Sequence, residues 1–540
     1  MAVTDTMVEA PPEPAELPAA PAAAPVEAVR AEITAVERVI GAVDHKVVGR
    51  LYLVSGALFA VAAFTARMMG WAGEGGNPML GTWSAQVRES ADVAVILLGL
   101  MPLIVGLAIY VVPLQVGARG ISFPRLVSLS FYGWLVSALV FAASVLGDGG
   151  LGGKSLEMNR LGLFSLAAGA GFVLAGMIAV MTTVLTLRAP GMTLARTPMF
   201  SYSILVTGAV WLATVPAVFA SAALAQAGRL DAAALQVQVV DQLRFLGWQP
   251  AIWMIAIPLV GLAVDVVPVA TNARLQQRFL FRGLIVALGI GAFGVWALDL
   301  EVAANTVVWS GQATLALLAV LATVGGLTPA LRRSQGLPGI PVSLLGVLTS
   351  LGLALLAALV GFAAALNTLG GDEEGLLGLP TVNGLIAGQA NLVLGAVVSG
   401  LLGALAYWGV KITGKPSAKL PPAFFGLLAA LGGLLAGAGP IIDAVASVNG
   451  GDGAEVGSSA LVAVGSLVMA MALLGAAALI ILEGRTQGGP SDPFSGHTLE
   501  WLTQSPPAPE NFEGPLPEVL SASPLLDARE AGTDAEGIVQ

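Results

Sequence analysis

The sequence lacks cysteine altogether, and this excludes disulfide bonds, thiolate metal sites and iron–sulfur clusters. Histidine is nearly absent too, because the only two, His45 and His497, lie outside the long apolar runs. A site built from several imidazole groups inside a membrane is therefore excluded. Charged residues make up only 11% of the chain, less than half the share usual in soluble domains.

What the chain has instead is apolar sequence, with 56% hydrophobic residues and 68 glycines among 540 residues. Runs long enough to cross a bilayer recur from about Leu51 to Leu482. We expect an all-α polytopic membrane protein with twelve transmembrane helices, at 48–69, 92–116, 125–147, 162–187, 199–226, 250–272, 280–301, 304–327, 340–367, 384–409, 421–446 and 458–483.

The 24 Lys and Arg residues test this count of helices, because the cytoplasmic loops of membrane proteins are enriched in them. With the N-terminus inside, eighteen of them fall on the inside and six on the outside, Arg67 among the six. This bias predicts an even number of spans with both termini in the cytoplasm. The net charge of −10 arises largely in the terminal segments, so it says little about partners.

The two ends of the chain differ in composition from the membrane region at 44–485. Residues 1–43 are rich in Ala, Pro and Glu and lack the basic start and apolar stretch of a signal peptide, so they predict a disordered cytoplasmic tail. Residues 486–540 are Pro-rich and acidic. They predict an extended cytoplasmic tail that is free to lie along a partner.

Five stretches of the sequence form a distinctive set. They are DHKVVGRLYLV (44–54), MPLIVGLAIYVVPLQVGARGISFPRLVSLSFYG (101–133), LRAPGMTLARTPMFSYSILVT (187–207), AYWGVKITGK (406–415) and DPFSGHTLEWLTQSPPAPENF (492–512). In these stretches the chain resembles subunit I of the haem–copper oxidases, in the aa3-type cytochrome c oxidase branch. The resemblance implies a twelve-helix bundle in a bacterial-type plasma (inner) membrane, which in this family houses a low-spin haem, a high-spin haem and a copper ion.

The resemblance places the family's haem ligands at positions that hold other residues here. The low-spin haem histidine of the second helix falls on Ala91. The two histidines of the tenth helix, one for each haem, fall on Gln389 and Asn391 in the stretch QANLVL. Residues i and i+2 of a helix point to nearly opposite sides. We therefore expect the two amides to face opposite flanks of one helix.

The copper ligands and the groups beside them are also replaced. Where the family reads HPEVY, this chain reads QPAIW, so the copper histidine position is Gln249, the proton-gate glutamate position is Ala251 and the tyrosine position is Trp253. Two further copper histidines fall on Leu298 and Asp299. Amide oxygen is a poor ligand for haem iron, and copper prefers imidazole or sulfur.

These substitutions predict that the chain binds neither haem nor copper and that it has no catalytic residues. We expect a non-catalytic scaffold subunit of a respiratory or other membrane redox complex. Its expected partners are membrane subunits such as oxidase subunits II and III and the lipid bilayer, with no nucleic acid. Family resemblance alone favours the alternative, a terminal oxidase with cytochrome c oxidase activity in aerobic respiration.

Ionisable residues at membrane depth open a third hypothesis, because they are costly there unless they have a function or a partner. Asp265, Asp299 and Glu301 are the candidates for a proton or cation path. The competing interpretation, which we favour, is that each acid is neutral and hydrogen-bonded or lies near water. Asp92 is expected at a helix end.

Four tryptophans, Trp248, Trp253, Trp296 and Trp309, gather in the expected sixth to eighth helices. They would either form a cage for a ligand such as a quinone or a lipid, or fill the volume that two absent haems leave. Unfilled cavities cost about 24 cal/mol per Å³. This cost favours the filling role.

Overall fold

The computed structural model of the chain describes residues 44–74, 83–226, 251–292, 303–333, 342–369, 382–415, 421–447, 455–483, 488–512, 514, 516 and 518–532. The described residues all lie in one unit of the chain, Ala42–Gln540. The expected N-terminal tail, 1–43, lies outside the described residues.

Helices make up most of the described chain. In order they are α2 (His45–Glu74), α3 (Trp83–Ala94), η1 (Val95–Leu100), α4 (Met101–Gln115), α5 (Pro124–Leu146), α6 (Leu156–Thr186), α7 (Met199–Gln226), η3 (Ala251–Ile255), α9 (Ile257–Ala270), α10 (Arg278–Ala292), α11 (Ala303–Arg333), α12 (Val342–Thr368), α13 (Asn383–Thr413), α14 (Pro421–Ala446), α15 (Glu455–Glu483), η6 (Leu499–Leu502) and α16 (Pro524–Glu530).

Local sequence signals mark several helix ends. Proline stands in the first turn of α5 and α9, where its missing N–H has no intrahelical partner to lose. The Ser155 hydroxyl accepts the Met158 N–H at 3.4 Å and caps the start of α6. Gly414, with a φ of 79°, ends α13 in the left-handed conformation that glycine adopts without strain.

Eleven helical segments of the described chain are long and apolar enough to cross a membrane. The expected all-α, multi-pass membrane fold is thus confirmed. The span expected at 280–301 begins as α10, and its remainder from residue 293 lies outside the described residues.

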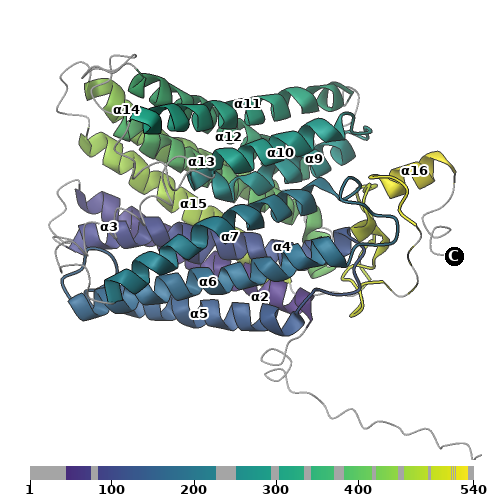
Figure 1. Cartoon of the computed structure of the whole chain (residues 1–540), viewed down its shortest axis with the longest axis horizontal. Coiled ribbons are helices and arrows are strands. Elements are labelled where there is room, and N and C mark those ends of the chain that lie inside the picture. The colour runs from purple at the N-terminus through teal and green to yellow at the C-terminus, as the bar shows by residue number, and fades with distance from the viewer. Residues whose placement is uncertain are drawn as a thin grey trace, which may run out of the picture. The chain divides into compact units, whose positions relative to one another are not determined.

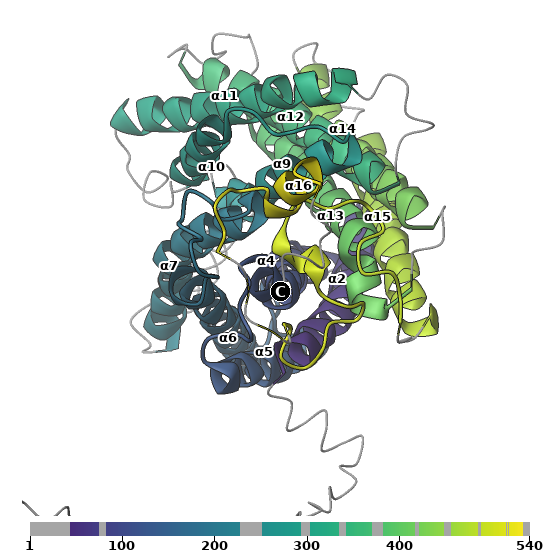
Figure 2. The same ribbon diagram turned by 90° about the vertical axis from the view of Figure 1, so that its right-hand side faces the viewer.

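Most consecutive helices pack against each other along the chain, and α15 returns to pack against α2. Figure 1 shows the helices running side by side, and Figure 2 shows the same bundle end-on. α4, α9 and α13 lie towards the middle of the bundle, where nearly all of their residues are buried. These three helices therefore form much of the bundle interior.

Glycines let the central helix α13 approach its neighbours closely. A Cβ atom added to Gly395 would lie 2.5 Å from the Cα of Gly433 on α14. On the other side, a Cβ atom added to Gly346 of α12 would lie 2.8 Å from the Cα of Gly403. The many glycines of the sequence thus serve helix packing at these positions, as small residues do in membrane proteins.

α3, the π-helical turn η1 and α4 form one continuous span, Gln86–Gln115. Asp92 lies within this span, so the expectation that it marks a helix end is wrong. π-Helical turns are rare and often lie at functional sites. Ala91 and Asp92 lie in the last turn of α3, four and three residues before the π-helical turn begins at Val95.

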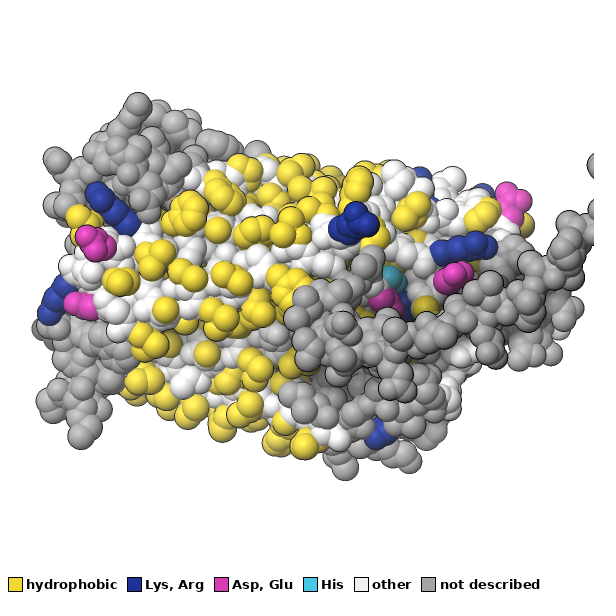
Figure 3. Space-filling model, turned by 90° about the horizontal axis from the view of Figure 1, so that it is seen from below, with side chains coloured by type: hydrophobic (Ala, Val, Ile, Leu, Met, Phe, Trp, Pro, Cys, Tyr) yellow, Lys and Arg dark blue, Asp and Glu magenta, His cyan; other side chains and the backbone are white. Residues whose placement is uncertain are grey.

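The surface of the bundle has the character of a lipid-facing wall. Apolar side chains cover the middle of the face shown in Figure 3, whereas Lys, Arg, Asp and Glu lie towards its two ends. Large side chains such as Leu139, Phe164 and Ile290 are more than half exposed. An apolar middle between charged ends is the pattern that a bilayer requires.

Residues 488–532, which we call the C-terminal cap, pack on one end of the bundle in Figure 1. Lys46 at the start of α2 donates to the backbone oxygen of Pro509 in the cap at 2.9 Å. Arg274, between α9 and α10, forms ion pairs with Asp527 and Glu530 of α16. Much of the cap is extended. It lies along the helix bundle of the same chain, whereas the sequence left it free to lie along a partner.

Candidate functional site

Four polar residues form a network that joins α2, α3, α13 and α15; Arg67, Asn391 and Ser466 are buried, and the Asp92 side chain is 37% exposed. Nε of Arg67 donates to Oδ1 of Asp92 at 2.5 Å, Nη1 donates to Oγ of Ser466 at 3.0 Å, and Nη2 donates to Oδ1 of Asn391 at 2.7 Å. The Arg67 side chain is only 6% exposed. A buried charge is tolerated when it is paired and hydrogen-bonded, and the Asp92 carboxylate supplies the pairing.

Both ends of the Asn391 amide are engaged in this network. Its Oδ1 accepts from Arg67, and its Nδ2 donates to the backbone oxygen of Ala436 on α14 at 3.0 Å. Ser466 in turn donates to the backbone oxygen of Val462 at 2.7 Å. The amide is therefore held in place by two neighbouring helices, α2 and α14.

The family resemblance implies haem ligands at two positions here, Asn391 within the network and Ala91 beside Asp92. Ala91, beside Asp92, is buried, and its methyl group has no atom that can bind iron. The oxygen of Asn391 already receives an N–H from Arg67. Haem iron takes imidazole, thiolate, thioether or phenolate ligands. The residues present do not fit an axially ligated haem at these positions.

A small cavity lies between α2, α4, α13 and α15, ten or more residues along α2 and α13 from Arg67 and Asn391. Its volume is about 20 Å³, and it is lined by Leu53, Ala57, Leu103, Leu107, Leu401, Leu402, Leu405, Leu473, Ala476 and Ala477. A single water molecule needs roughly 10–15 Å³ by this measure. All of the lining side chains are apolar.

Gln389 lies on a different flank of α13 from Asn391. It is fully buried, and neither its Oε1 nor its Nε2 has a hydrogen-bond partner in the described part of the chain. Leu385 and Ile386, three and four residues earlier on the same helix face, belong to a cluster against which Trp309 of α11 packs. The Gln389 flank thus looks towards α11 and α12, and the Asn391 flank looks towards α2 and α15.

The structure describes only some of the other positions that the family resemblance implies for the haem and copper centre. Trp253 in η3 is buried, and its indole N–H has no hydrogen-bond partner among the described residues. Ala251 begins the same 3₁₀ turn. The remaining positions lie outside the described residues, namely Gln249, Leu298, Asp299 and Glu301 and the tryptophans Trp248 and Trp296.

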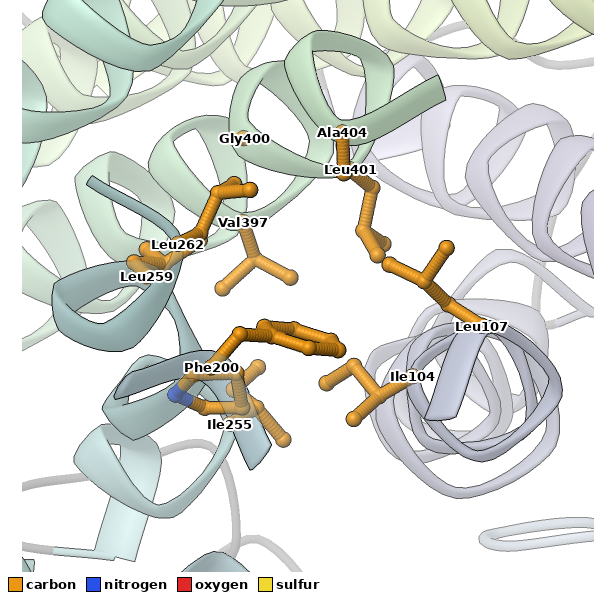
Figure 4. A pocket seen from close by; sticks show the side chains of 11 residues that line it. Ile104, Leu107, Phe200, Ile255, Leu259, Leu262, Val397, Gly400, Leu401 and Ala404 are labelled. Carbon is orange, nitrogen blue, oxygen red and sulfur yellow. The ribbon is translucent and has the colours of Figure 1, made fainter. Parts of the chain in front are cut away.

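The centre of the bundle is packed with apolar side chains, as Figure 4 shows. Ile104 and Leu107 of α4, Phe200 of α7, and Val397 and Leu401 of α13 point towards a common space of about 10 Å³. This space is at the lower limit for one water molecule. No polar side chain lines it.

The two histidines lie at the capped end of the bundle, away from the polar network. Nδ1 of His45 donates to the backbone oxygen of Ile109 at 2.9 Å, so Nε2 accepts from Nδ2 of Asn511 in the cap at 3.0 Å. His497 of the cap is buried, and burial together with the guanidinium groups of Arg529 in the cap and of Arg278 and Arg274 in the bundle lowers its pKa to about 4. In the described ranges, no three His, Cys, Asp or Glu side chains gather into a potential metal site.

Asp265 is the one candidate for an ion path that the structure describes, and it holds together three helices. Its Oδ1 accepts the backbone N–H of Met199 at 3.0 Å, and its Oδ2 accepts the backbone N–H of Phe200 at 2.9 Å, both at the start of α7. Gln115 at the end of α4 donates to Oδ2 at 3.3 Å. These contacts match the interpretation of a hydrogen-bonded acid that caps a helix N-terminus.

A second buried carboxyl group reaches the same place from the cap. Glu500 in η6 is fully buried, and its Oε1 accepts from Nε2 of Gln115 and from Nε1 of Trp408, both at 3.2 Å. Burial raises the pKa of Glu500 to about 7, and the neighbouring Asp265 carboxylate adds to the effect. Beside it, Lys411 donates to the backbone oxygen of Thr503 at 2.5 Å.

Two of these functional residues were not predicted from the sequence. Arg67 falls near the end of the expected span 48–69 and counts only as one of the outside Lys and Arg residues, because the partners that bury it lie on other helices. Glu500 was treated as one acid of a solvated tail. The signal that pointed towards it was the stretch TLEW, in which an acid stands between Leu499 and Trp501, both now seen to be buried.

Comparison with known proteins agrees with this architecture. Residues 46–476 match the family described as cytochrome c and quinol oxidase polypeptide I. Cytochrome c oxidase subunit 1 of Bacillus subtilis is 26% identical over 490 residues, which cover 83% of this chain and 75% of that protein. A haem–copper oxidase subunit I+III of Aeropyrum pernix is 26% identical over 453 residues, and the chain spans about half of its length, 53%.

A solved structure supports the same fold. It is that of a haem–copper terminal oxidase dimer studied by cryo-electron microscopy, with a TM-score of 0.58 over 93% of this chain and 90% of that one. At 13% sequence identity this likeness shows the fold alone. Together with the match over residues 46–476, it leads to one conclusion. The chain belongs to the cytochrome c and quinol oxidase polypeptide I family.

Proposed function

We propose that this chain is a haem-free and copper-free member of its family that serves as a scaffold subunit in a membrane redox complex. The observation that carries the proposal is the Arg67 network. A guanidinium group, a carboxylate, a hydroxyl and an amide bond to one another where the low-spin haem ligands of the family would stand. Fold does not determine function when the residues of the site differ.

The chemistry of the ligand positions supports the proposal. A haem at this place needs two axial ligands, and the chain offers a methyl group at Ala91 and an amide at Asn391 whose oxygen is already in use. A copper ion needs imidazole or sulfur ligands, and the chain contains no cysteine and only two histidines. Both histidines are occupied with structural contacts or buried at the capped end.

The partners proposed for the scaffold are membrane subunits of the oxidase type. One relative is named as a fusion of subunits I and III, so chains of this family are made to join others in one assembly. The bacterial plasma membrane is the proposed location, with both termini in the cytoplasm. The retained cap and the apolar wall provide surfaces for such contacts.

A pull-down from the native host tests the scaffold role. The full chain is tagged, extracted in a mild detergent, and its co-purifying proteins are identified by mass spectrometry. Subunits II and III of an oxidase, or an electron-donating enzyme, recovered in fixed ratio with the chain would support the proposal. A chain that purifies alone with haem and oxidase activity would establish the competing function, a terminal oxidase.

The remaining alternative is a conduit for protons or cations through Asp265, Asp299 and Glu301. Asp265 is tied up in capping α7, which is a structural task. Flux measurements in proteoliposomes separate the two functions. A scaffold predicts flux no greater than that of empty vesicles, and a conduit predicts flux that Asp299→Asn abolishes.

A further inference from the structure

Two carboxyl groups from distant parts of the chain share one amide nitrogen. Nε2 of Gln115 donates to Oδ2 of Asp265 at 3.3 Å and to Oε1 of Glu500 at 3.2 Å. The orientation of this amide is fixed, because its Oε1 accepts the Ser201 hydroxyl at 2.7 Å. Asp265 belongs to α9, Gln115 to α4 and Glu500 to the C-terminal cap. The shared nitrogen makes the two carboxyl groups close neighbours in a buried place.

The two carboxyl groups have different surroundings. Asp265 accepts two backbone N–H groups at the start of α7, an arrangement that suits a negative charge. Glu500 receives the side-chain N–H groups of Gln115 and Trp408, both on Oε1, and weaker hydrogen bonds from the Thr498 side chain and its own backbone N–H oppose the effect of burial on its pKa. Its Oε2 has no hydrogen-bond partner in the described part of the chain. Of the two groups, Glu500 is the one that gains more from holding a proton.

Two cations face the pair of carboxyl groups, Lys411 near Glu500 and Arg278 near Asp265. Lys411 of α13 donates to the backbone oxygen of Thr503, and no ion pair with Glu500 occurs among the described residues. Asp265 from α9 and Asp492 from the cap add negative charge nearby, and Tyr407 of α13 faces the same cluster. Two neighbouring carboxylates in a buried place favour uptake of one proton by the pair.

We propose that Glu500 and Asp265 form a proton-binding site, in which Glu500 holds the proton while the C-terminal cap is docked on the bundle. Because Glu500 belongs to the cap, binding of the proton and docking of the cap are coupled. When the cap leaves the bundle, Glu500 meets water and loses the proton at neutral pH. The site makes attachment of the cap sensitive to the proton concentration on that side of the membrane.

The direction of the coupling follows from the pKa of Glu500, which burial raises from 4.5 to about 7. Between these values the docked state binds more protons than the undocked state, so docking weakens as the pH rises. Docking is therefore strongest below about pH 4.5 and has lost the contribution of Glu500 above about pH 7. Between pH 5 and pH 8 this contribution changes the docking equilibrium constant roughly 50-fold.

The absence of native cysteine allows a direct test with the full chain in lipid nanodiscs. Ser505 in the cap is buried and its hydroxyl has no hydrogen-bond partner in the described chain, so Ser505→Cys provides a reporter thiol. Its rate of maleimide labelling measures how often the cap leaves the bundle. The rates are compared between this reporter and the reporter with Glu500→Gln, which mimics the protonated group. Both proteins carry the same thiol and the same other titratable groups. Dividing one labelling rate by the other at each pH therefore removes the effect of their titration.

We expect the labelling rate of the reporter, relative to that with Glu500→Gln, to rise roughly 50-fold between pH 5 and pH 8. The matched control is Glu510→Gln, which replaces an exposed acid of the same cap. The labelling rate of the reporter relative to that with Glu510→Gln stays constant over this pH range. A quotient that is also constant for Glu500→Gln would overturn the proposal.

A second measurement covers the case in which Glu500→Gln disturbs docking itself. Infrared spectra of the full chain at pH 5 contain the carbonyl stretch of a buried protonated carboxyl group if the proposal is right. This band disappears as the pH rises through about 7 and is missing in Glu500→Gln, whereas Glu510→Gln retains it. A wild-type spectrum with no such band at pH 5 would refute the assignment of the proton to Glu500.

Discussion

Arg67 on α2 donates a hydrogen bond from Nη2 to Oδ1 of Asn391 on α13 at 2.7 Å, across 324 positions of sequence. The same guanidinium group reaches Asp92 on α3 and Ser466 on α15. One side chain therefore connects four helices at a place where this family is implied to hold a haem. In this chain, an ion pair and hydrogen bonds connect these helices. They take the place of the metal ligation that the family resemblance implies.

Arg67→Ala is expected to destabilise the protein by roughly 1–3 kcal/mol, because it leaves the buried Asn391 and Ser466 oxygens without a donor, whereas water reaches the Asp92 carboxylate. Thermal unfolding in detergent, followed by tryptophan fluorescence, measures the loss. Arg125→Ala is the control, since Arg125 is exposed. Equal midpoints for the two variants would show that the network contributes nothing to stability.

Returning histidines to the low-spin positions should not restore haem binding. In Ala91→His with Asn391→His, Arg67 still occupies the region, with its guanidinium group paired to Asp92 and bonded to Ser466. We expect no haem in the pyridine haemochrome assay of the double variant expressed with added haem precursor. Haem at one equivalent per chain would mean that the network yields readily and that the flank is still shaped for the cofactor.

Asp265→Asn tests whether this acid has a structural role or a role in ion transport. The substitution removes a carboxylate that accepts two backbone N–H groups at the start of α7, and loss of such a cap costs about 0.5–2 kcal/mol. We expect a lower unfolding midpoint and no change in proton flux in proteoliposomes. Unchanged stability together with a loss of flux would favour the conduit.

His497 should act on the cap in the opposite sense to Glu500. Burial and the nearby Arg529 lower the pKa of His497 from 6.5 to about 4, so the undocked cap binds more protons between these values. The contribution of His497 to docking is therefore present above about pH 6.5 and is lost as the pH falls towards 4. In the Ser505→Cys reporter, this contribution slows labelling as the pH rises from 4.5 to 6.5, and His497→Asn should remove it. A pH profile identical to that of the parent reporter would contradict this assignment.

Much of the fold was predictable, because apolar runs of bilayer length are a local property of the sequence. Each of the twelve expected spans has a described helix at its position, although the span at 280–301 is described only in part. The different flanks of Gln389 and Asn391 also follow from local geometry, since residues two positions apart on a helix diverge.

The candidate sites were harder to predict, because their partners are distant in sequence. Arg67 resembles a loop residue until Asp92 and Asn391 are seen to surround it. Glu500 resembles a solvated acid in a Pro-rich tail, and only folding of the cap onto α4 and α13 buries it. Long-range packing, which composition and periodicity do not encode, determined both sites.

The haem and copper content of the purified full chain tests the central claim most directly. The chain is expressed in a host that makes haem and is supplied with copper, and both are quantified per chain by the pyridine haemochrome assay and by elemental analysis. We predict neither haem nor copper above the level of a membrane protein that lacks both. Haem in stoichiometric amount, with the reduced-minus-oxidised spectrum of a ligated iron, would contradict this account and establish the chain as a working oxidase subunit.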